Sequence, residues 1–312
     1  MARAYGSRAQ MALAFESVYG TAPAGGFIKM PFASATLGSE QPLIDNELLG
    51  YGRDPLSPTR DAIVVDGDVV GPVDVVGIGH WLKGLFGAPV TTGTTPKVHT
   101  FASGAFDLPS MSIELGHPEV PRFELYSGVR ANSMRVEATR RGLLQTTIGL
   151  VAQGVAPNAT TQAGTPSTFA LTRFGHFNCA ITRNGTSLGN IVSADFTYSN
   201  NLDRVETIRA DGKIDGADPT IASLGGQIRA RFADTTLLDQ AIAGGSCELA
   251  FTWSLGANAS LAVTAHSVFL PVPRRPVQGP GGIEASFDWQ AALATSPARM
   301  CTVVLTNTVA AY

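Results

Sequence analysis

Two residue patterns alternate along the chain, a strand-like period of two and a helix-like apolar stripe, and the change from one to the other occurs twice. Residues 67–87 begin as an alternating strand and continue as a helical pattern after Asp74, and residues 225–245 do the same after Asp234. An aspartate before a helix accepts hydrogen bonds from its first amide groups, and a glycine after the helix suits the left-handed stop. The predicted helix caps are Asp74, Gly87, Asp234 and Gly244.

Each predicted helix has a single apolar stripe. A helix this short is marginal alone, so each is expected to pack against a sheet. The stripe residues are Ile78, Leu82 and Leu85 in the first helix and Leu238, Ala241 and Ile242 in the second.

Period-two alternation predicts half-buried strands around the helices. Residues 191–199 and 283–290 each place apolar side chains on one face and polar side chains on the other. One dry and one wet face is typical of antiparallel sheets. The predicted fold class is mainly β, with two tandem β-sandwich or barrel modules, each with one short flanking α-helix and a long extended loop.

The order of elements is the same in the two halves, which indicates an internal duplication. Each half has a strand, a long irregular stretch, the strand-to-helix unit, an alternating segment and a closing hairpin. The alternating segments match Ser110 with Ser260 and His117 with His266, and the closing hairpins are residues 133–153 and 282–307. The predicted domains are a first module at 1–156, a small polar linker at 157–168 and a second module at 169–312.

A long stretch in the first module, residues 39–60, has no periodicity, although it contains several large apolar side chains. Unstructured loops longer than about 12–15 residues are uncommon and usually functional. It is either a surface loop with a few buried anchors or, as we favour, an arm across a neighbouring subunit. Burial there would contribute roughly 1.5–3 kcal/mol per large apolar side chain. The predicted arm residues are Leu43, Ile44, Leu48, Leu49, Tyr51 and Arg53.

Composition excludes several classes of protein. The net charge is −3 and the chain has no basic stripe, so it is not expected to hold nucleic acid through its phosphates. The most apolar region, residues 62–90, is interrupted by charged residues, so no membrane insertion is expected. The start of the chain lacks an apolar secretion signal, and the three cysteines are expected to be free thiols in a reducing cytoplasm.

No motif indicates catalysis. The five histidines are scattered without metal-ligand spacing, and neither a nucleophile elbow nor a phosphate-binding loop is present. The predicted protein is therefore not an enzyme and has no metal or cofactor. A hydrolase that uses His117 and His266 is the minority alternative, because duplication explains the recurrence of these histidines more simply.

Three segments and a closing pattern resemble the major tail tube proteins of long-tailed, siphovirus-type bacteriophages, in the class with a duplicated module. The segments are "AYGSRAQMALAFESVYGTAP", "GSEQPLIDNELLGYGRDP" and "DGDVVGPVDVVGIGHWLKGLFGAP", and the closing pattern is "PGGIEASFDWQAA…TVVLTN". The resemblance covers essentially the whole chain. It implies a structural virion protein whose rings stack into a tube, with a continuous β-barrel around the genome channel and residues 39–60 as an inter-ring arm.

The resemblance also implies partners. Two modules per chain would close a homotrimeric ring with pseudo-sixfold symmetry, and the runner-up is a homohexamer with the second module outside. Other expected partners are the tape measure protein, the tail terminator and tip proteins, and viral DNA that passes without specific binding. The expected location is the virion tail, after assembly in the host bacterial cytoplasm. The alternative function is a carbohydrate- or receptor-binding β-sandwich of the tail tip or capsid surface.

A channel for DNA is expected to have a wet wall that is weakly charged or acidic. Gln227, Arg229 and Arg231 complicate this expectation, because they match Asp68, Val70 and Pro72 of the first copy. Either the arginines pair with acidic neighbours from the adjacent module, as we favour, or their face is an interface. The candidate channel residues are Asp66, Asp68, Glu137, Ser193, Asp195, Thr197, Gln227, Arg229, Arg231, Glu284, Ser286 and Asp288.

Overall fold

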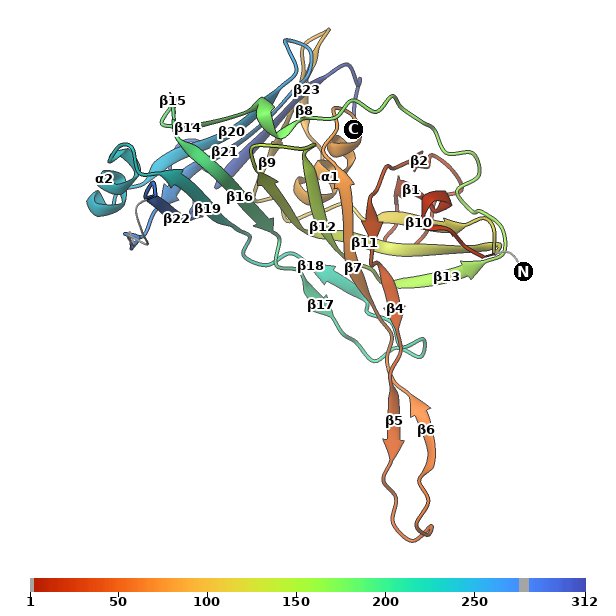
Figure 1. Ribbon diagram of the computed structural model, residues 1–312. Helices are drawn as coiled ribbons and strands as arrows, with labels where there is room; N and C mark the ends of the chain where they lie inside the picture. Colours follow the sequence, from red (N-terminus) through yellow and green to blue (C-terminus); the bar gives the residue numbers. More distant parts are fainter. Residues whose placement is uncertain (1–2, 275–280) are drawn as a thin grey trace.

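The computed structural model describes residues 3–274 and 281–312, and Figure 1 shows the arrangement of its elements. The fold is mainly β, as the sequence predicts, and the described part of the chain has two α-helices. The helical elements are the 3-10 turns η1 (Gly6–Arg8) and η2 (His176–Asn178) and the helices α1 (Gly77–Phe86) and α2 (Thr236–Ala243).

The strands of the first half are β1 (Gln10–Phe15), β2 (Ile28–Lys29), β3 (Ser34–Ala35), β4 (Gly38–Glu40), β5 (Leu43–Asn46), β6 (Leu56–Arg60), β7 (Val64–Pro72), β8 (Val90–Thr92), β9 (Lys97–Ala102), β10 (Met111–His117), β11 (Arg122–Ala138), β12 (Gln145–Val151) and β13 (Gly154–Asn158). The strands of the second half are β14 (Cys179–Arg183), β15 (Thr186–Ser187), β16 (Ile191–Ser199), β17 (Asp203–Val205), β18 (Gly216–Asp218), β19 (Ser223–Arg231), β20 (Cys247–Ser254), β21 (Ser260–Phe269), β22 (Glu284–Ala291) and β23 (Cys301–Asn307).

One antiparallel sheet, which we call the inner sheet, runs through both halves. Its order is β3 and β4, then β7, β12, β11, β16, β19 and β22. The halves join where the second part of β11 pairs with β16, from Ser133 opposite Ser199 to Ala138 opposite Ala194.

An outer layer of strands covers the apolar face of the inner sheet. In the first half the order is β2, β1, β10, the first part of β11, and β13. In the second half it is β15, β14, β20, β21 and β23, and the layer continues into β9 and β8 of the first half. The outer strands of the second half are therefore joined to the first half through its β8–β9 hairpin.

The strand pairings repeat from one half to the other. The pairs β4–β7, β7–β12, β12–β11, β11–β10, β11–β13 and β10–β1 correspond to β16–β19, β19–β22, β22–β21, β21–β20, β21–β23 and β20–β14. Each helix follows the corresponding strand, β7 or β19. The halves thus have one topology, and the β8–β9 hairpin is an addition to the first.

A glycine at the same place in each half supports this correspondence. Gly67 in β7 lies against the backbone of Leu37, and Gly226 in β19 lies against the backbone of Asp195 and Phe196. A Cβ atom at either glycine would overlap these backbone atoms, so the neighbouring strand can approach closely only where no side chain is present.

Two parts of the sequence alignment between the halves are wrong. The strand that contains His117, β10, corresponds to β20, whereas His266 lies in β21, the counterpart of β11. Residues 282–307 are also not a hairpin, because β22 pairs with β19 and β21 while β23 pairs with β21 and β9. An alternating pattern does not show which strand of a hairpin it belongs to. The β8–β9 hairpin also adds two strands after α1 that have no counterpart after α2, so strands counted from the two helices do not correspond.

The core lies between the inner sheet and the outer layer. Aromatic rings bridge the layers in the second half, where the ring centroids of Phe196 and Phe251 are 5.4 Å apart and those of Phe251 and Trp289 are 5.8 Å apart. In the first half α1 fills this space and is buried at every position except Lys83. Its counterpart α2 buries only Leu237, Leu238 and Ala241, and the predicted stripe residue Ile242 is exposed.

Both helices have aspartate side chains at their starts and glycines at their ends. Asp74 accepts hydrogen bonds from the amides of Val76 and Gly77, at 3.0 and 2.7 Å, and is almost fully buried. Asp234 accepts one from the amide of Thr236 at 3.0 Å. Gly87 and Gly244 follow the helices with φ values of 86° and 67°, which favour glycine.

Burial raises the pKa of Asp74, although the amide hydrogen bonds of Gly77 and Val76 partly offset this effect. Burial also lowers the pKa of His80 in α1 to about 4, and Lys83 adds to the shift. The first helix therefore carries polar groups into the core, while α2 keeps its cap at the surface.

The linker predicted at 157–168 is packed against the first half. Pro157 and Asn158 belong to β13, where they pair with Glu124 and Phe123. Further along, the amides of Gln162 and Ala163 donate to Glu114. The start of this segment is therefore a strand of the first half's outer layer.

Candidate assembly surfaces and channel face

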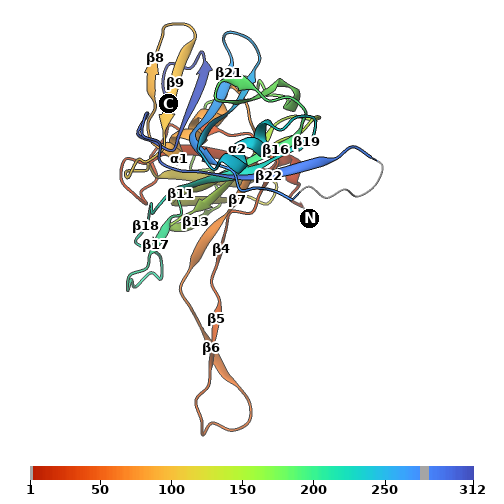
Figure 2. The same ribbon diagram turned by 90° about the vertical axis from the view of Figure 1, so that its left-hand side faces the viewer.

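The predicted arm is a hairpin that projects from one end of the inner sheet. Strands β5 and β6 pair only with each other, and Figures 1 and 2 show them extending away from the body. Leu49 is 94% exposed, and the other predicted arm residues, Leu43, Ile44, Leu48, Tyr51 and Arg53, are exposed as well. The two strands were not anticipated from the sequence, because Pro42, Pro55 and Pro58 interrupt the alternation.

The loop of the second half that corresponds to the arm folds back onto its own chain. This loop, residues 200–222, contains β17 and β18. Asn200 is buried and donates to the carbonyls of Leu85 and Ala131, and Arg204 forms an ion pair with Asp66. The amide of Ile63, at the base of the arm, donates to Gly212 in this loop at 2.9 Å. Both loops therefore leave the same end of the inner sheet, but only the arm stands free.

All twelve candidate channel residues lie on the polar face of the inner sheet. The register aligns Glu137, Asp195, Gln227 and Asp288 in one row across four neighbouring strands. Ser193, Arg229 and Ser286 form a second row, and Arg231 lies opposite Glu284. Asp66 and Asp68 lie on the same face of β7, and Thr197 lies beyond the first row. The opposite face carries buried residues such as Val136, Phe196, Ile228 and Phe287.

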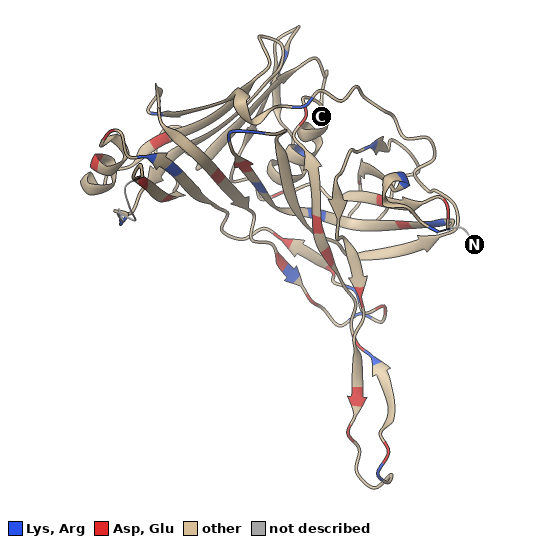
Figure 3. Ribbon diagram, in the orientation of Figure 1, with Lys and Arg blue, Asp and Glu red and all other residues tan. Residues whose placement is uncertain are grey.

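Figure 3 shows charged residues of both signs along the strands of the inner sheet, and those on the polar face form ion pairs. Arg229 is 2.8 Å from Glu284, and Arg231 is 4.0 Å from the same carboxylate. The arginines thus pair within their own half and not with the adjacent one, because Glu284 lies on the next strand of the same sheet. Across the junction between the halves, Arg135 is 3.8 Å from Asp195. Burial raises the pKa of Asp195, and Arg135 opposes this shift.

Several residues of the polar face are not among the predicted channel residues. Ser133 and Arg135 alternate with the buried Met134 and Val136, so the period that identified Glu137 also identifies them. On β12, the next strand, Gln145 and Thr147 face the same way, because they lie opposite Pro72 and Val70 of β7.

The inner sheet has open edges at both ends. Among the described residues, β22 pairs along its length with β19, but on its other side only Ala291 and Gln290 pair, with Val268 and Phe269 of β21. At the other end, β4 pairs with β7, and the described chain provides no strand on its far side. Open edges of this kind are ready to pair with another chain.

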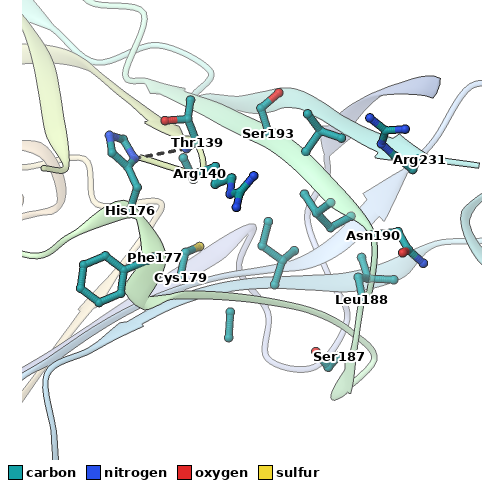
Figure 4. Close-up of a pocket in the computed structure, with 15 residues that line it drawn as sticks. Thr139, Arg140, His176, Phe177, Cys179, Ser187, Leu188, Asn190, Ser193 and Arg231 are labelled. Carbon is teal, nitrogen blue, oxygen red and sulfur yellow. Dashed lines mark hydrogen bonds between the residues drawn. The ribbon is translucent and has the colours of Figure 1, made fainter. Parts of the chain in front are cut away.

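A cavity of about 660 Å³, which we call the end cavity, lies at the end of the inner sheet opposite to the arm (Figure 4). Strands β11 and β19 finish there and β16 begins, whereas the arm leaves where β4 finishes and β7 begins. Arg140 and Arg231 line the cavity together with Phe177, Leu188 and Ile191. Thr139, at the end of β11, donates its amide hydrogen to Nδ1 of His176 at 3.2 Å.

The histidines of the hydrolase alternative do not form a common site. His117 ends β10, at the turn into β11. His266 lies in β21, where its Nε2 is 2.8 Å from the Thr302 hydroxyl and its Nδ1 is 3.5 Å from Glu248.

Cys179, Cys247 and Cys301 are free thiols, and burial raises the pKa of Cys179 to about 12. Within residues 3–274 and 281–312, no group of three or more His, Cys, Asp or Glu side chains is arranged to hold a metal ion. Neither helix in these ranges has the length and apolar character needed to cross a membrane.

An antiparallel β subunit with open sheet edges, a polar sheet face and a projecting hairpin belongs to the class of assembly-forming structural proteins. The chain matches the family described as phage tail tube protein over residues 6–291, which is most of its length. It belongs to this family. None of the curated proteins compared with the chain matches it significantly.

Family membership confirms the resemblance deduced from the sequence. The chain is a structural component of the phage tail that self-assembles into a tube, and its family indicates a non-enzymatic role. Nothing in the comparison supports the carbohydrate- or receptor-binding alternative.

Proposed function

We propose that three chains close a ring in which the inner sheets form one continuous barrel. The observation that carries this proposal is the repeated pairing, which places two equivalent sets of inner strands in one chain and leaves an edge open at each end. The end of β21, which lies beside β22, would join the β4 edge of the next chain, as the second part of β11 joins β16. Closure removes exposed edges, and cyclic symmetry is the common solution for homo-oligomers.

Within this ring, the two modules at 1–156 and 169–312 would occupy alternating positions around the channel. The polar face of the inner sheet would then line the passage. Two of its arginines, Arg135 and Arg229, are already paired with carboxylates, so few cationic groups are free to bind phosphates. DNA would therefore pass without specific binding.

The arm would join one ring to the next. It leaves the end of the inner sheet, and its exposed apolar side chains need a surface outside their own chain. The tube formed by these contacts would be assembled in the host cytoplasm around the tape measure protein and be closed by terminator and tip proteins.

Electron microscopy combined with mass measurement tests the ring. Top-view class averages of assembled protein should show six similar lobes, while the mass per ring equals three chains of 32.5 kDa. Six chains per ring would contradict the proposal and favour the hexamer with the second module outside.

A further inference from the structure

The arm and the end cavity lie at opposite ends of the same sheet. When a surface on one copy binds a different surface on the next copy, the contact can repeat along a filament. If the two surfaces lie at opposite ends of the subunit, the copies stack end to end. Each chain has one arm and one end cavity, so every arm in a stack of rings could be matched by one cavity.

The tip of the arm is acidic and apolar. Residues 45–54, "DNELLGYGRD", contain Asp45, Glu47 and Asp54 against the single cation Arg53. Between these charges Leu48, Leu49 and Tyr51 are 63%, 94% and 68% exposed. Gly50 and Gly52 have φ values of 93° and 100°, so the backbone turns sharply on both sides of Tyr51 and presents its ring at the tip.

The end cavity has the complementary character. Its lining includes Arg140 and Arg231, and no described lining residue is an aspartate or glutamate. Glu284, outside the lining, is 2.8 Å from Arg229 and 4.0 Å from Arg231, so it pairs mainly with Arg229. Leu188 and Ile191 form its apolar wall, and Phe177 is 80% exposed beside it. Figure 4 shows the labelled side chains of Arg140 and Leu188 around the same space. A volume of about 660 Å³ is within the range of roughly 300–1,000 Å³ that binding pockets span.

We propose that the end cavity receives the arm tip of a second copy of this chain. Leu48, Leu49 and Tyr51 would enter the apolar part, while Asp45 and Glu47 would approach Arg140 and Arg231. This assignment rests on the proposed stacking of rings, and it adds the surface on the receiving ring that makes the contact.

Charge reversal tests the electrostatic part of this assignment. Arg140→Glu with Arg231→Glu should raise the concentration needed for polymerisation by about tenfold or more, because acidic groups would then face each other. Asp45→Lys with Glu47→Lys should have the same effect. Combining all four substitutions in one chain, or mixing the two variants, should restore tubes, since each arm then meets a cavity of opposite charge.

Arg122→Glu, an exposed arginine in the outer layer, is the matched control and should leave polymerisation unchanged. Thermal unfolding of each variant shows whether the subunit itself remains folded. Failure of both rescues, in variants that remain folded, contradicts the assignment.

Cross-linking tests the geometry without altering charge. Cys179 is a free thiol in the cavity lining, so the test uses a Cys179→Ser background. In tubes of Leu49→Cys/Ser187→Cys in this background, a short bismaleimide should link neighbouring chains into a ladder, because Ser187 lines the cavity. In the same Cys179→Ser background, Leu49→Cys with Phe106→Cys, at an exposed position that does not line the cavity, should give no ladder. Intact tubes without a ladder in the first variant would overturn the docking site and leave the tube function standing, whereas wild-type protein that forms no tube would overturn the proposed function itself.

Discussion

The loop between β4 and β7 and the loop between β16 and β19 occupy the same place in the two halves, yet they behave in opposite ways. The first is a free hairpin whose apolar side chains are exposed. The second is held down by Asn200 in the core, by the ion pair of Arg204 with Asp66, and by Arg130, which donates to the Ala217 carbonyl. Corresponding positions in the two halves therefore differ: one loop is bound within its own chain, and the other is free for the contact with a second chain that we propose.

The two helices show the same divergence. Helix α1 lies inside the sandwich with buried residues around its whole circumference, whereas α2 covers the core with one side only. The first half thus combines the more deeply buried helix with the more exposed loop, which predicts that variants in the two halves will affect stability and assembly differently.

The largest expected effect comes from the arm. Replacing Leu48, Leu49 and Tyr51 together by serine should abolish polymerisation and leave subunit unfolding unchanged, because these side chains make no core contact in their own chain. Negative-stain microscopy and thermal unfolding measure the two properties. The comparison variant, Ile208→Ser with Ile221→Ser in the second loop, should still form tubes, and equal losses in both variants would show that the two loops share one role.

A core truncation in α1 should have the next largest effect. Leu85→Ala removes a fully buried side chain and should lower the free energy of unfolding by about 2–5 kcal/mol. Ile242→Ala in α2 removes a side chain that is 63% exposed and should change it by about 0.5 kcal/mol or less. Denaturant unfolding measures both values, and similar losses would contradict the different burial of the helices.

Acid sensitivity should come from α1 through His80. Its imidazole is buried beside Phe15 and Tyr312, and burial lowers its pKa from 6.5 to about 4. The unfolded chain takes up this proton at higher pH than the folded chain, so stability is lost as the pH falls from 6.5 towards 4, by up to about 3 kcal/mol.

Unfolding measured across this pH range should show a shallower loss in His80→Gln than in the unsubstituted chain. Helix α2 contains no histidine. An unchanged slope in His80→Gln would assign the acid sensitivity to groups outside α1.

The helix caps should differ by a smaller amount. Asp74→Ala leaves the buried amide of Gly77 without its acceptor and should cost about 1–3 kcal/mol, whereas Asp234→Ala, where water can reach the exposed Thr236 amide bond, should cost about 0.5–1 kcal/mol.

Asp74→Asn is the control, because it keeps an acceptor without the buried charge. Burial raises the pKa of Asp74, so the folded chain favours the protonated carboxyl group and loses stability as the pH rises through that pKa. At neutral pH, Asp74→Asn should therefore be at least as stable as the unsubstituted chain. A loss as large as that of Asp74→Ala would show that the charge itself is needed.

Local chemistry made much of the fold predictable. The capping aspartates and the terminal glycines depend on hydrogen bonds and φ values that a few neighbouring residues determine. The same holds for the pair Asn184–Gly185, since an Asn-Gly sequence favours a two-residue hairpin turn. The turn joins β14 to β15, and both of its residues have positive φ. The polar face of the inner sheet was likewise accessible, because burial on one side imposes a period of two.

Long-range pairing could not be predicted in the same way. No local signal indicates that β11 leaves the outer layer midway and joins β16, or that β23 pairs with β9 and not with β22. The end cavity could not be predicted from the sequence for the same reason. Arg140 and Arg231 are far apart along the chain, and only the register of β11, β16 and β19 brings them to the same cavity.

The pairing of β9 with β23 makes the second half depend on the first, because one neighbour of β23 comes from the first half. Six residues of β23, from Thr302 to Asn307, lie against the inserted hairpin of the first half. At the end of this ladder, Asn307 donates to the Val75 carbonyl just before α1 and to the Tyr312 hydroxyl. The second half expressed alone would therefore have an unpaired edge along β23, and a stable version of it would need a replacement for the β8–β9 hairpin.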